Sequence, residues 1–179
     1  MGVAQVPAPA KLITGLISAR VPHFALVKKI LEKKFGEVDS ETVVLDFSCT
    51  AYYEKEFGKN LKRKFFSFKR LIPLHKNYEI KLCTNKIERR LSGNNKRTTN
   101  IDPGYVSLTK LVLFTTKNRS HRIYLDRGIY AERELEYVGG TFRPLDWTYP
   151  DYRTAGYIEF FNSAREAYKR EITKCGSSG

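Results

Sequence analysis

The sequence predicts an α+β fold built on a ferredoxin-like split βαβ core with a mixed or antiparallel sheet. Apolar residues recur at steps of three and four in segments 22–35 and 75–91, which is the period of amphipathic helices. They alternate or run together in segments 11–19, 42–48 and 63–72, which is typical of strands. With one more strand after the second helix, the order is strand, helix, strand, strand, helix, strand. An added helix, a β-hairpin and a C-terminal helix complete the prediction.

In the first part of the chain, residues that favour the ends of elements mark their boundaries. Pro22 is a favoured first residue of a helix, and Gly36 is a favoured residue just beyond its end. Segment 42–48 alternates between apolar and polar residues, which indicates a strand with two different faces. Segment 63–72 carries many Lys and Arg residues among its aromatic ones, and we expect this strand to end at Pro73.

The middle of the chain predicts a strand, a turn and a helix. Segment 98–101 is the expected strand, and it leads into 102–105, where Pro103 and Gly104 occupy the second and third positions of a type II turn. Segment 107–117 is the expected helix, with its first residue, a serine, as the N-terminal cap.

Segments 121–125 and 129–137 predict a β-hairpin. Keeping the apolar residues on one face sets Leu125 opposite Ile129 and leaves a three-residue loop, 126–128, with Gly at its left-handed position. In this register His121 lies beside the apolar row, on the face opposite to Arg122. The facing pairs are Arg122 with Glu132, Tyr124 with Tyr130, and His121 with Arg133.

The length and composition favour one domain. The chain has 179 residues, of which 41% are hydrophobic and 13% aromatic, which is enough apolar material for a packed core. A last amphipathic helix follows Thr154 and ends near residue 172. We expect residues 1–10 to form a flexible N-terminus, residues 11–173 a single α+β domain, and residues 174–179 a flexible tail.

Several classes of protein are not indicated. The three cysteines and three histidines are scattered, so neither a disulfide framework nor a zinc site is suggested, and no metal or cofactor is assigned. No apolar run approaches the roughly 20 residues of a membrane span, and the N-terminus lacks a signal-peptide pattern. The chain contains neither a phosphate-binding P-loop motif nor a serine-hydrolase motif. We therefore expect a cytoplasmic protein that does not enter a membrane.

The charge of the chain is strongly positive. Lys and Arg number 32 against 19 Asp and Glu, which gives a net charge of +13. Such an excess attracts nucleic acid, nucleotides or acidic membrane surfaces, and aromatic residues interleaved with Lys and Arg are suited to unpaired RNA. Solvated surface charge without a function explains the same composition, and the sequence leaves both interpretations open.

The strand, turn and helix predicted over residues 100–110 suggest a phosphate site. The first N–H groups of a helix have no partner within the helix and carry a partial positive charge. Gly104, Ser107 and Lys110 would then be the phosphate-binding residues. The alternative is that Ser107 only caps the helix and Asp102 only bonds its own turn.

Four residues are candidates for catalysis because carboxylates and an imidazole serve in acid-base chemistry or in metal binding at phosphoesters. They are Asp46, Asp102, His121 and Glu132. The alternative for Glu132 is an ion pair with Arg122 across the hairpin. Because Glu132, Glu134 and Glu136 share one strand face in the predicted register, we expect basic neighbours to offset their charge.

Several strings occur in an order that resembles a known prokaryotic family. They are KLITGLIS, DFSCTAYYEKEFG, FFSFKRLIP, EIKLCTNKIE, NIDPGYVSLTKLVLFTTK, HRIYLDRGIYAERELEY, FRPLDWTYPDYRT and YIEFFN. From about residue 11 to residue 169 the chain resembles domain-of-unknown-function family 4416. The resemblance implies a small cytoplasmic protein and supplies no established activity or catalytic residue.

The sequence thus supports three hypotheses about function. The first is a basic intracellular protein that binds a phosphorylated ligand, either a nucleotide or RNA, at residues 100–110. The second is a metal-assisted hydrolase or transferase that acts on a phosphorylated substrate through the four candidate residues. The third is an interaction protein without catalytic activity.

Overall fold

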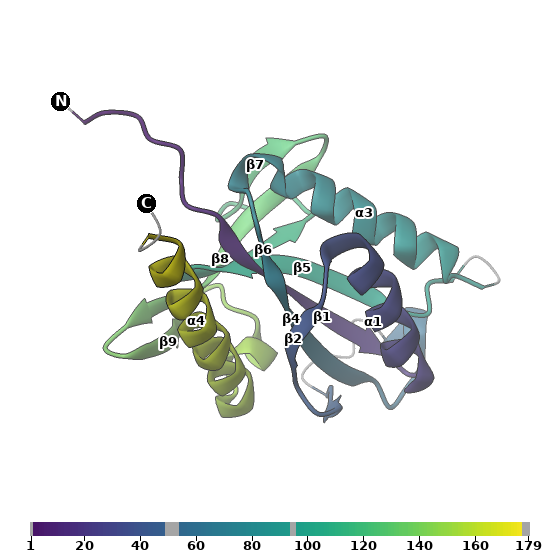
Figure 1. Cartoon of the computed structure of the whole chain (residues 1–179). Helices are drawn as coiled ribbons and strands as arrows, with labels where there is room; N and C mark the ends of the chain where they lie inside the picture. The colour runs from purple at the N-terminus through teal and green to yellow at the C-terminus, as the bar shows by residue number, and fades with distance from the viewer. Residues whose placement is uncertain (1, 49–53, 94–95, 177–179) are drawn as a thin grey trace.

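The computed structural model describes residues 2–48, 54–93 and 96–176. Within them the chain forms a nine-stranded sheet in which neighbouring strands are antiparallel, in the order β2-β4-β1-β5-β6-β8-β7 (Figure 1). The strands are β1 (Ala10–Ser18), β2 (Val38–Glu41), β3 (Leu45–Asp46), β4 (Lys62–Ile72), β5 (Asn100–Val106), β6 (Lys110–Thr115), β7 (Ile123–Asp126), β8 (Ile129–Val138) and β9 (Thr141–Pro144). Outside the main order, β3 pairs with β4 and β9 pairs with β8.

Helices cover both faces of this sheet. The helices are α1 (Pro22–Phe35), α2 (Glu54–Phe57), α3 (Asn77–Arg90) and α4 (Ala155–Gly176), with single 3₁₀ turns at Leu74–Lys76 and Pro150–Arg153. Helices α1 and α3 pack against one face, and α4 packs against the other (Figure 1). Strand β1 is buried along its whole length because a core lies on each side of it.

Alternate residues of β1 supply the two cores. Leu12 and Leu16 join the core under α1 and α3, whereas Ile13 joins the core under α4. The α1 residues Phe24, Val27, Leu31 and Phe35 complete the first core, as the helical spacing predicts. The α+β class is therefore confirmed, as are the helix that begins at Pro22 and the strand predicted at 63–72.

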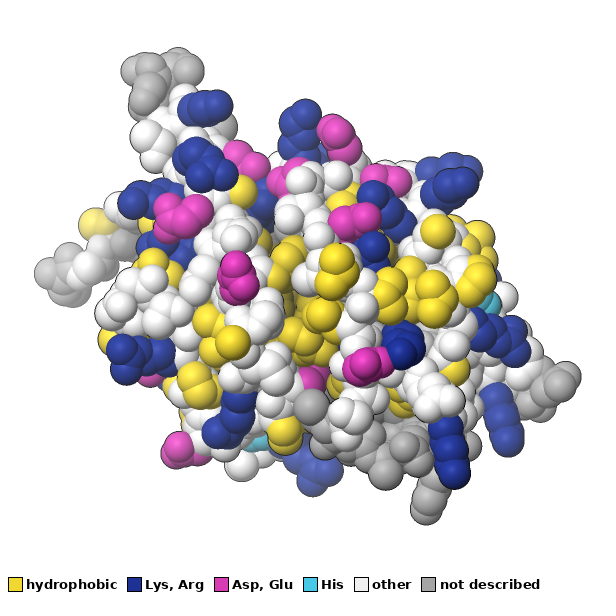
Figure 2. Space-filling view, turned by 90° about the horizontal axis from the view of Figure 1, so that it is seen from below, with side chains coloured by type: hydrophobic (Ala, Val, Ile, Leu, Met, Phe, Trp, Pro, Cys, Tyr) yellow, Lys and Arg dark blue, Asp and Glu magenta, His cyan; other side chains and the backbone are white. Residues whose placement is uncertain are grey.

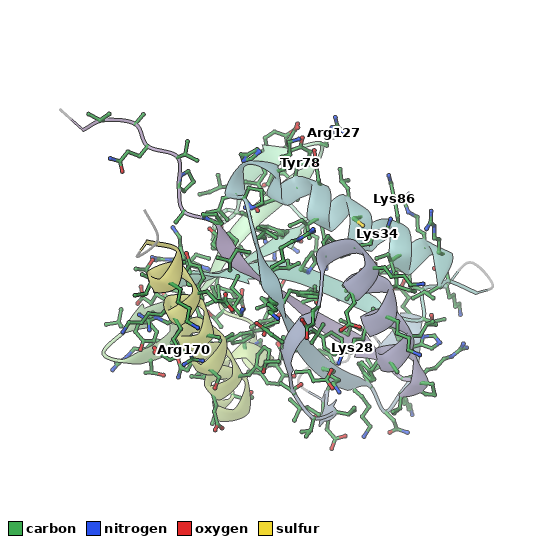
Figure 3. All side chains as sticks on the ribbon, in the orientation of Figure 1. Lys28, Lys34, Tyr78, Lys86, Arg127 and Arg170 are labelled. Atoms are coloured by element: carbon green, nitrogen blue, oxygen red, sulfur yellow. The ribbon has the colours of Figure 1, made fainter. Side chains whose placement is uncertain are left out.

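A contact at the edge of the molecule joins α3 to the β7–β8 hairpin. The guanidinium of Arg127 lies 5.7 Å from the ring centre of Tyr78, and the two side chains are neighbours in Figure 3. Such a cation–π contact at an exposed site contributes on the order of 0.5–1 kcal/mol.

The strand predicted at 42–48 is wrong in its boundaries. The structure has two shorter strands, β2 and β3, and Val43 and Val44 lie exposed between them. Strand β2 is the outermost strand at one end of the main sheet order, where polar residues can form a strand at little cost. It therefore lacks the alternation of apolar residues from which a strand is predicted.

The helix predicted at 107–117 is also wrong, because this segment contains β6. Residues 111–114 are four consecutive buried apolar residues. Val112 and Phe114 belong to the core under α1 and α3, whereas Leu111 and Leu113 belong to the core under α4. A strand covered on both faces accommodates such a run, and a cap-like serine before it does not make it a helix.

The predicted turn at 102–105 lies inside β5, and β5 and β6 form a hairpin instead. The N–H of Ser107 donates to the carbonyl of Lys110 at 2.9 Å and closes this hairpin. The free N–H groups of a helix on which the predicted phosphate site depends are therefore not present at Ser107.

Strands β5 and β6 pair only over a short distance and then separate. Their register runs from Val106 opposite Leu111 to Gly104 opposite Leu113. Beyond that point β5 stays paired with β1 as far as Asn100, and β6 stays paired with β8 as far as Thr115. Pro103, which has no N–H to donate, directly precedes the last pair.

Two charged side chains of α3 take the place of β6 where the strands separate. The carboxylate of Glu88 accepts a hydrogen bond from the N–H of Ile101 at 2.7 Å. The ammonium of Lys81 donates to the carbonyl of the same residue at 2.8 Å. Both backbone groups of Ile101 are thus satisfied on the side away from β1, where no strand lies beside it.

The β7–β8 hairpin has a tighter turn than predicted. Asp126 faces Ile129, so the loop is Arg127–Gly128, and both residues have positive φ (48° and 76°), as a type I′ turn requires. A register irregularity between Tyr124 and Asp126 accounts for the difference.

Parts of the predicted hairpin register are confirmed. Tyr124 faces Tyr130, and Arg122 pairs with Glu132. The predicted pairing of His121 with Arg133 is wrong, because His121 contacts Glu132. Strand β7 begins only at Ile123, so the strand period does not extend back to His121.

The helix at the C-terminus begins at Ala155, directly after Thr154, and continues to Gly176, beyond the predicted end of the domain at 173. In the part of the chain that the structure describes, no helix has the length and apolar character needed to cross a membrane.

A buried lysine ties four elements together. The ammonium of Lys11 in β1 lies 2.5 Å from a carboxylate oxygen of Asp39 and 2.8 Å from one of Glu171, and it donates to the carbonyl of Phe68 at 3.1 Å. These contacts join β1 to β2, β4 and α4. The apolar stem of Lys11 remains in the core while its charge is paired.

Glu134 is a buried carboxylate without an ion pair among the described residues. Its Oε1 accepts a hydrogen bond from the N–H of Tyr149 at 2.7 Å, whereas its Oε2 has no partner in the described part of the chain. Burial, assisted by the nearby carboxylates of Glu132 and Asp151, raises the pKa of Glu134 to about 8. A backbone N–H, and not a basic side chain as the sequence predicts, is therefore the hydrogen-bond donor to Glu134.

The absence of a side chain at Gly104 is predicted to be required for β5–β6 pairing. A Cβ there would lie 2.2 Å from the carbonyl oxygen of Val112, which is part of the backbone of β6. We expect Gly104→Ala to lower the free energy of unfolding by about 1–3 kcal/mol, as overpacking does. Gly156→Ala, which meets no atom within 4 Å, is the control and should be neutral or slightly stabilising. Equal effects of the two substitutions in denaturant unfolding would contradict this account.

The stability of the protein is predicted to depend on the ionisation of Glu134. In the unfolded chain this carboxyl ionises with its ordinary pKa of 4.5, whereas in the folded protein it keeps its proton until about pH 8. The folded state therefore binds more protons across this window, and its stability falls as the pH rises from 4.5 to 8. Glu134→Gln should gain stability relative to the parent protein across the same window, by a few kcal/mol at most. Denaturant unfolding at pH 5 and pH 8 measures this, and a difference between the two proteins that does not change with pH would contradict it.

Candidate functional site

A cleft opens at the end of the sheet where β5 and β6 separate. Its volume is about 560 Å³. One wall comes from α3 and the segment before β5, and the other from the segment between β6 and β7 and from residues 147–152. The side chains that carry its chemistry are Arg63, Lys81, Asn85, Arg97, Asn100, Asp102, Lys117, Arg119, His121, Arg122, Glu132, Trp147, Tyr149, Asp151 and Tyr152.

Arg63 of β4 is the most deeply buried cation of the cleft. Its guanidinium donates to the hydroxyl of Tyr152 at 2.7 Å and lies 3.5 Å from Asp102 and 3.8 Å from Asp151. Burial alone would lower the pKa of Arg63, but Tyr152 and the two carboxylates outweigh it, so the pKa lies above its ordinary value. Its Nε has no hydrogen-bond partner among the described residues.

Gly15 of β1 gives Arg63 the space to reach these partners. A Cβ at Gly15 would lie 2.8 Å from the ring of Phe65 and 3.0 Å from Nη2 of Arg63. The ring of Phe65 in turn lies under the guanidinium, 4.7 Å from its central carbon. The arginine is therefore fixed by packing on one side and by polar contacts on the other.

Asp102 of β5 is held by three groups. Its Oδ2 accepts a hydrogen bond from Nδ2 of Asn100 at 2.7 Å and lies near Arg63, and its Oδ1 lies 3.9 Å from the ammonium of Lys81. The side chain remains 26% exposed, so part of the carboxylate is open to a ligand in the cleft.

Arg97 joins the α3 wall to α2. Its guanidinium donates two hydrogen bonds to Glu56, at 2.6 and 2.7 Å, and one to Glu88 at 3.0 Å. Burial raises the pKa of Glu88 even though Lys81, Ile101 and Arg97 oppose the rise. This wall is a network of paired charges that is partly open to solvent at Arg97.

The opposite wall is built around Glu132 of β8. Its carboxylate accepts hydrogen bonds from Nε of Arg122 at 2.7 Å and from Nη2 at 3.3 Å, and it lies 3.1 Å from Nε2 of His121. The hydroxyl of Tyr149 accepts a further bond from Arg122 at 2.8 Å. The ring of His121 is stacked on Trp147, with 5.4 Å between ring centres and 12° between planes.

The lining of the cleft has more positive than negative groups. Six of its side chains are Lys or Arg and three are Asp or Glu. Lys117 and Arg119 are exposed on the segment between β6 and β7. Within the described residues, the Arg119 side chain makes no hydrogen bond or ion pair.

Figure 2 shows one face of the molecule, seen from below the view of Figure 1. Lys and Arg side chains project around its outline, and hydrophobic side chains gather toward its middle. The positive charge of the chain is therefore spread over the surface and is not confined to the cleft.

Three of the four residues predicted for catalysis lie together in the cleft: Asp102, His121 and Glu132. Asp46 does not line it. Its side chain is 81% exposed and pairs with Lys62 on the neighbouring strand. Among residues 2–48, 54–93 and 96–176, no three or more His, Cys, Asp or Glu side chains are grouped so that they could hold a metal ion.

The three residues predicted to bind phosphate also lie outside the cleft. Ser107 and Lys110 belong to the β5–β6 hairpin, and the hydroxyl of Ser107 lies 3.4 Å from the carbonyl of Lys110. Gly104 lies within β5, where β6 approaches it closely. The structure has a strand, β6, where the helix was predicted, so the predicted phosphate site is not formed there.

Sequence reasoning did not assign Arg63, Arg97 or Trp147 to a site of this kind. Arg63 and Trp147 belong to the interleaved cationic and aromatic residues that suggested an RNA surface. A signal for the position of Arg63 was present, because it precedes Phe65 by two positions in a strand and therefore shares the face of a buried ring. No local pattern marks Arg97, which reaches the cleft from an irregular segment.

The comparisons with known proteins concern the family and not the activity. Neither a curated protein nor a solved structure matches the chain. The model of one family, described as Domain of unknown function (DUF4416), matches residues 8–168. These residues include all the strands, helices α1 to α3, most of α4 and every side chain of the cleft, so the chain belongs to the DUF4416 family.

Proposed function

We propose that the cleft binds a phosphorylated small molecule of the nucleotide class. The observation that carries the proposal is the chemistry of the lining, in which cations outnumber carboxylates and aromatic rings stand exposed beside them. Glu134, which accepts a hydrogen bond from the backbone of the lining residue Tyr149, has its pKa raised to about 8 by burial and so adds little negative charge at neutral pH.

The phosphate end of the ligand belongs at the outer rim. The buried cations Arg63 and Lys81 are already paired with carboxylates and backbone oxygens. Arg119 is exposed on the rim and has no partner in the described part of the chain. A phosphate there gains a charge-assisted hydrogen bond without breaking an existing pair.

The remainder of the cleft suits a sugar and a base. Trp147 and Tyr149, which are 39% and 40% exposed, offer ring surfaces for stacking. The open part of the Asp102 carboxylate accepts hydrogen bonds from hydroxyl or amino groups. The hydrogen-bond donor Arg119 at the rim thus suits the phosphate of a nucleotide. The acceptor Asp102 suits its sugar or base.

The size of the cleft favours a small ligand over RNA. A volume of about 560 Å³ lies within the roughly 300–1,000 Å³ of small-molecule sites. A single strand of RNA requires a groove that follows several nucleotides. The exposed lysines elsewhere would contribute long-range attraction to either ligand.

We also propose that the first part of the sheet is a ferredoxin-like split βαβ core. The strand order β2-β4-β1-β5 supports this, as does the position of α1 between β1 and β2 and of α3 between β4 and β5. The remaining strands then extend this core on the β5 side, and the cleft lies at the junction.

The binding proposal predicts a fluorescence change when a nucleotide enters the cleft, because Trp147 is the only tryptophan of the chain. Titration with AMP, GMP, ATP, GTP and inorganic phosphate should give saturable changes for at least one nucleotide. Arg119→Gln should weaken that binding about tenfold, the equivalent of one charge-assisted contact.

The matched control is Arg170→Gln, which removes an exposed arginine on α4 (Figure 3) that does not line the cleft. It should leave the affinity nearly unchanged. Equal effects of the two substitutions would contradict the assigned site. Binding of a single-stranded RNA oligonucleotide together with no binding of any nucleotide would contradict the ligand class.

A further inference from the structure

We infer that His121, oriented by Glu132, acts as a general base that activates water for hydrolysis of the terminal phosphate of a nucleotide bound in the cleft. The inference rests on the proposed function, because it requires a phosphorylated ligand beside His121. It extends that function from binding to a reaction.

The hydrogen bond to Glu132 fixes which nitrogen of His121 is basic. Glu132 already accepts two hydrogen bonds from Arg122, and an ionised carboxylate has no proton to donate. The 3.1 Å contact between Nε2 and Oε2 therefore has Nε2–H as its donor. In the neutral imidazole the lone pair is then on Nδ1.

The position of the ring is fixed from three segments of the chain. Glu132 comes from β8, His121 from the segment before β7, and Trp147 from the segment that follows β9. Trp147 is itself held by a hydrogen bond from Nε1 to the carbonyl of Arg133 at 2.8 Å. An orientation imposed by a carboxylate on one side and a stacked ring on another is the kind of preorganisation that a general base requires.

Stability alone does not require His121 at this position. The carboxylate of Glu132 is 3% exposed, and the guanidinium of Arg122, also 3% exposed, already compensates its charge through two hydrogen bonds. His121 adds a second, 20% exposed partner that lines the cleft. Within the described residues, Nδ1 of His121 makes no hydrogen bond, so this nitrogen is open to water or to a ligand.

The reaction is balanced without a further reactant. As the oxygen of a water molecule forms a bond to phosphorus, one of its protons passes to Nδ1 of His121. The bond between phosphorus and the leaving oxygen breaks, and its electron pair stays on that oxygen. The imidazolium, stabilised by Glu132, then gives its proton to the leaving oxygen. The products are inorganic phosphate and a nucleoside from a monophosphate, or inorganic phosphate and a nucleoside diphosphate from a triphosphate. Arg119 lies on the rim where the charge of the phosphate is placed.

The test measures release of inorganic phosphate from AMP, GMP, ATP and GTP, together with binding of the same four compounds by calorimetry. We expect phosphate release by the parent protein from at least one of them. His121→Asn should reduce the rate about a hundredfold or more, the usual contribution of a general base, while the dissociation constant changes by less than about threefold. His75→Gln, an exposed histidine outside the cleft, is the control and should leave the rate unchanged.

The charge of Glu132 distinguishes a base from a structural histidine. Glu132→Gln should lower the rate of phosphate release while nucleotide binding is retained, because the carboxylate stabilises the imidazolium that forms during the reaction. An unchanged rate in His121→Asn overturns the inference, as does binding of a nucleotide without phosphate release. The absence of any binding overturns the proposed function itself.

Discussion

The cleft depends on the place where β5 stops pairing with β6. If the two strands stayed together beyond Gly104, the sheet would be continuous and no space would open between its two halves. Separation leaves backbone groups of β5 without a strand partner, and Glu88 and Lys81 satisfy those of Ile101. This explains why two charged residues of α3 are buried: they replace a strand at the point where the sheet divides, and they do so at the edge of the cleft.

The paired charges around Asp102 give the cleft a fixed shape. Arg63, Asn100 and Lys81 approach this carboxylate from β4, β5 and α3, so its position is set by three elements and not by one loop. Removal of one member of such a network leaves a buried charge without compensation, which costs more than the pair contributes. The polar groups of the cleft are therefore preorganised, and a ligand need not order them when it binds.

The sequence predicted most of the helices and the central strands, because the period of apolar residues in α1 and α3 reports directly which face is buried. It failed at residues 107–117, where Leu111 to Phe114 are buried on two sides and no period remains to distinguish a strand from a helix. For the site, Asp102, His121 and Glu132 were found from their residue types. Their convergence, and the participation of Arg63, depends on the divergence of β5 and β6, which is a tertiary feature without a local signal.

The net charge of +13 and the chemistry of the cleft act at different distances. Exposed cations such as Lys34, Lys86 and Arg170 lie on three different helices (Figure 3) and raise the local concentration of any polyanion, an effect that salt screens over roughly a Debye length of 8–10 Å. They do not select one anion over another. Selection requires groups whose positions are fixed and whose hydrogen bonds are directed, and these are found where Asp102, Trp147 and the His121–Glu132 pair face a common space. We therefore propose that a phosphorylated ligand drawn to the surface by charge is recognised where the sheet divides.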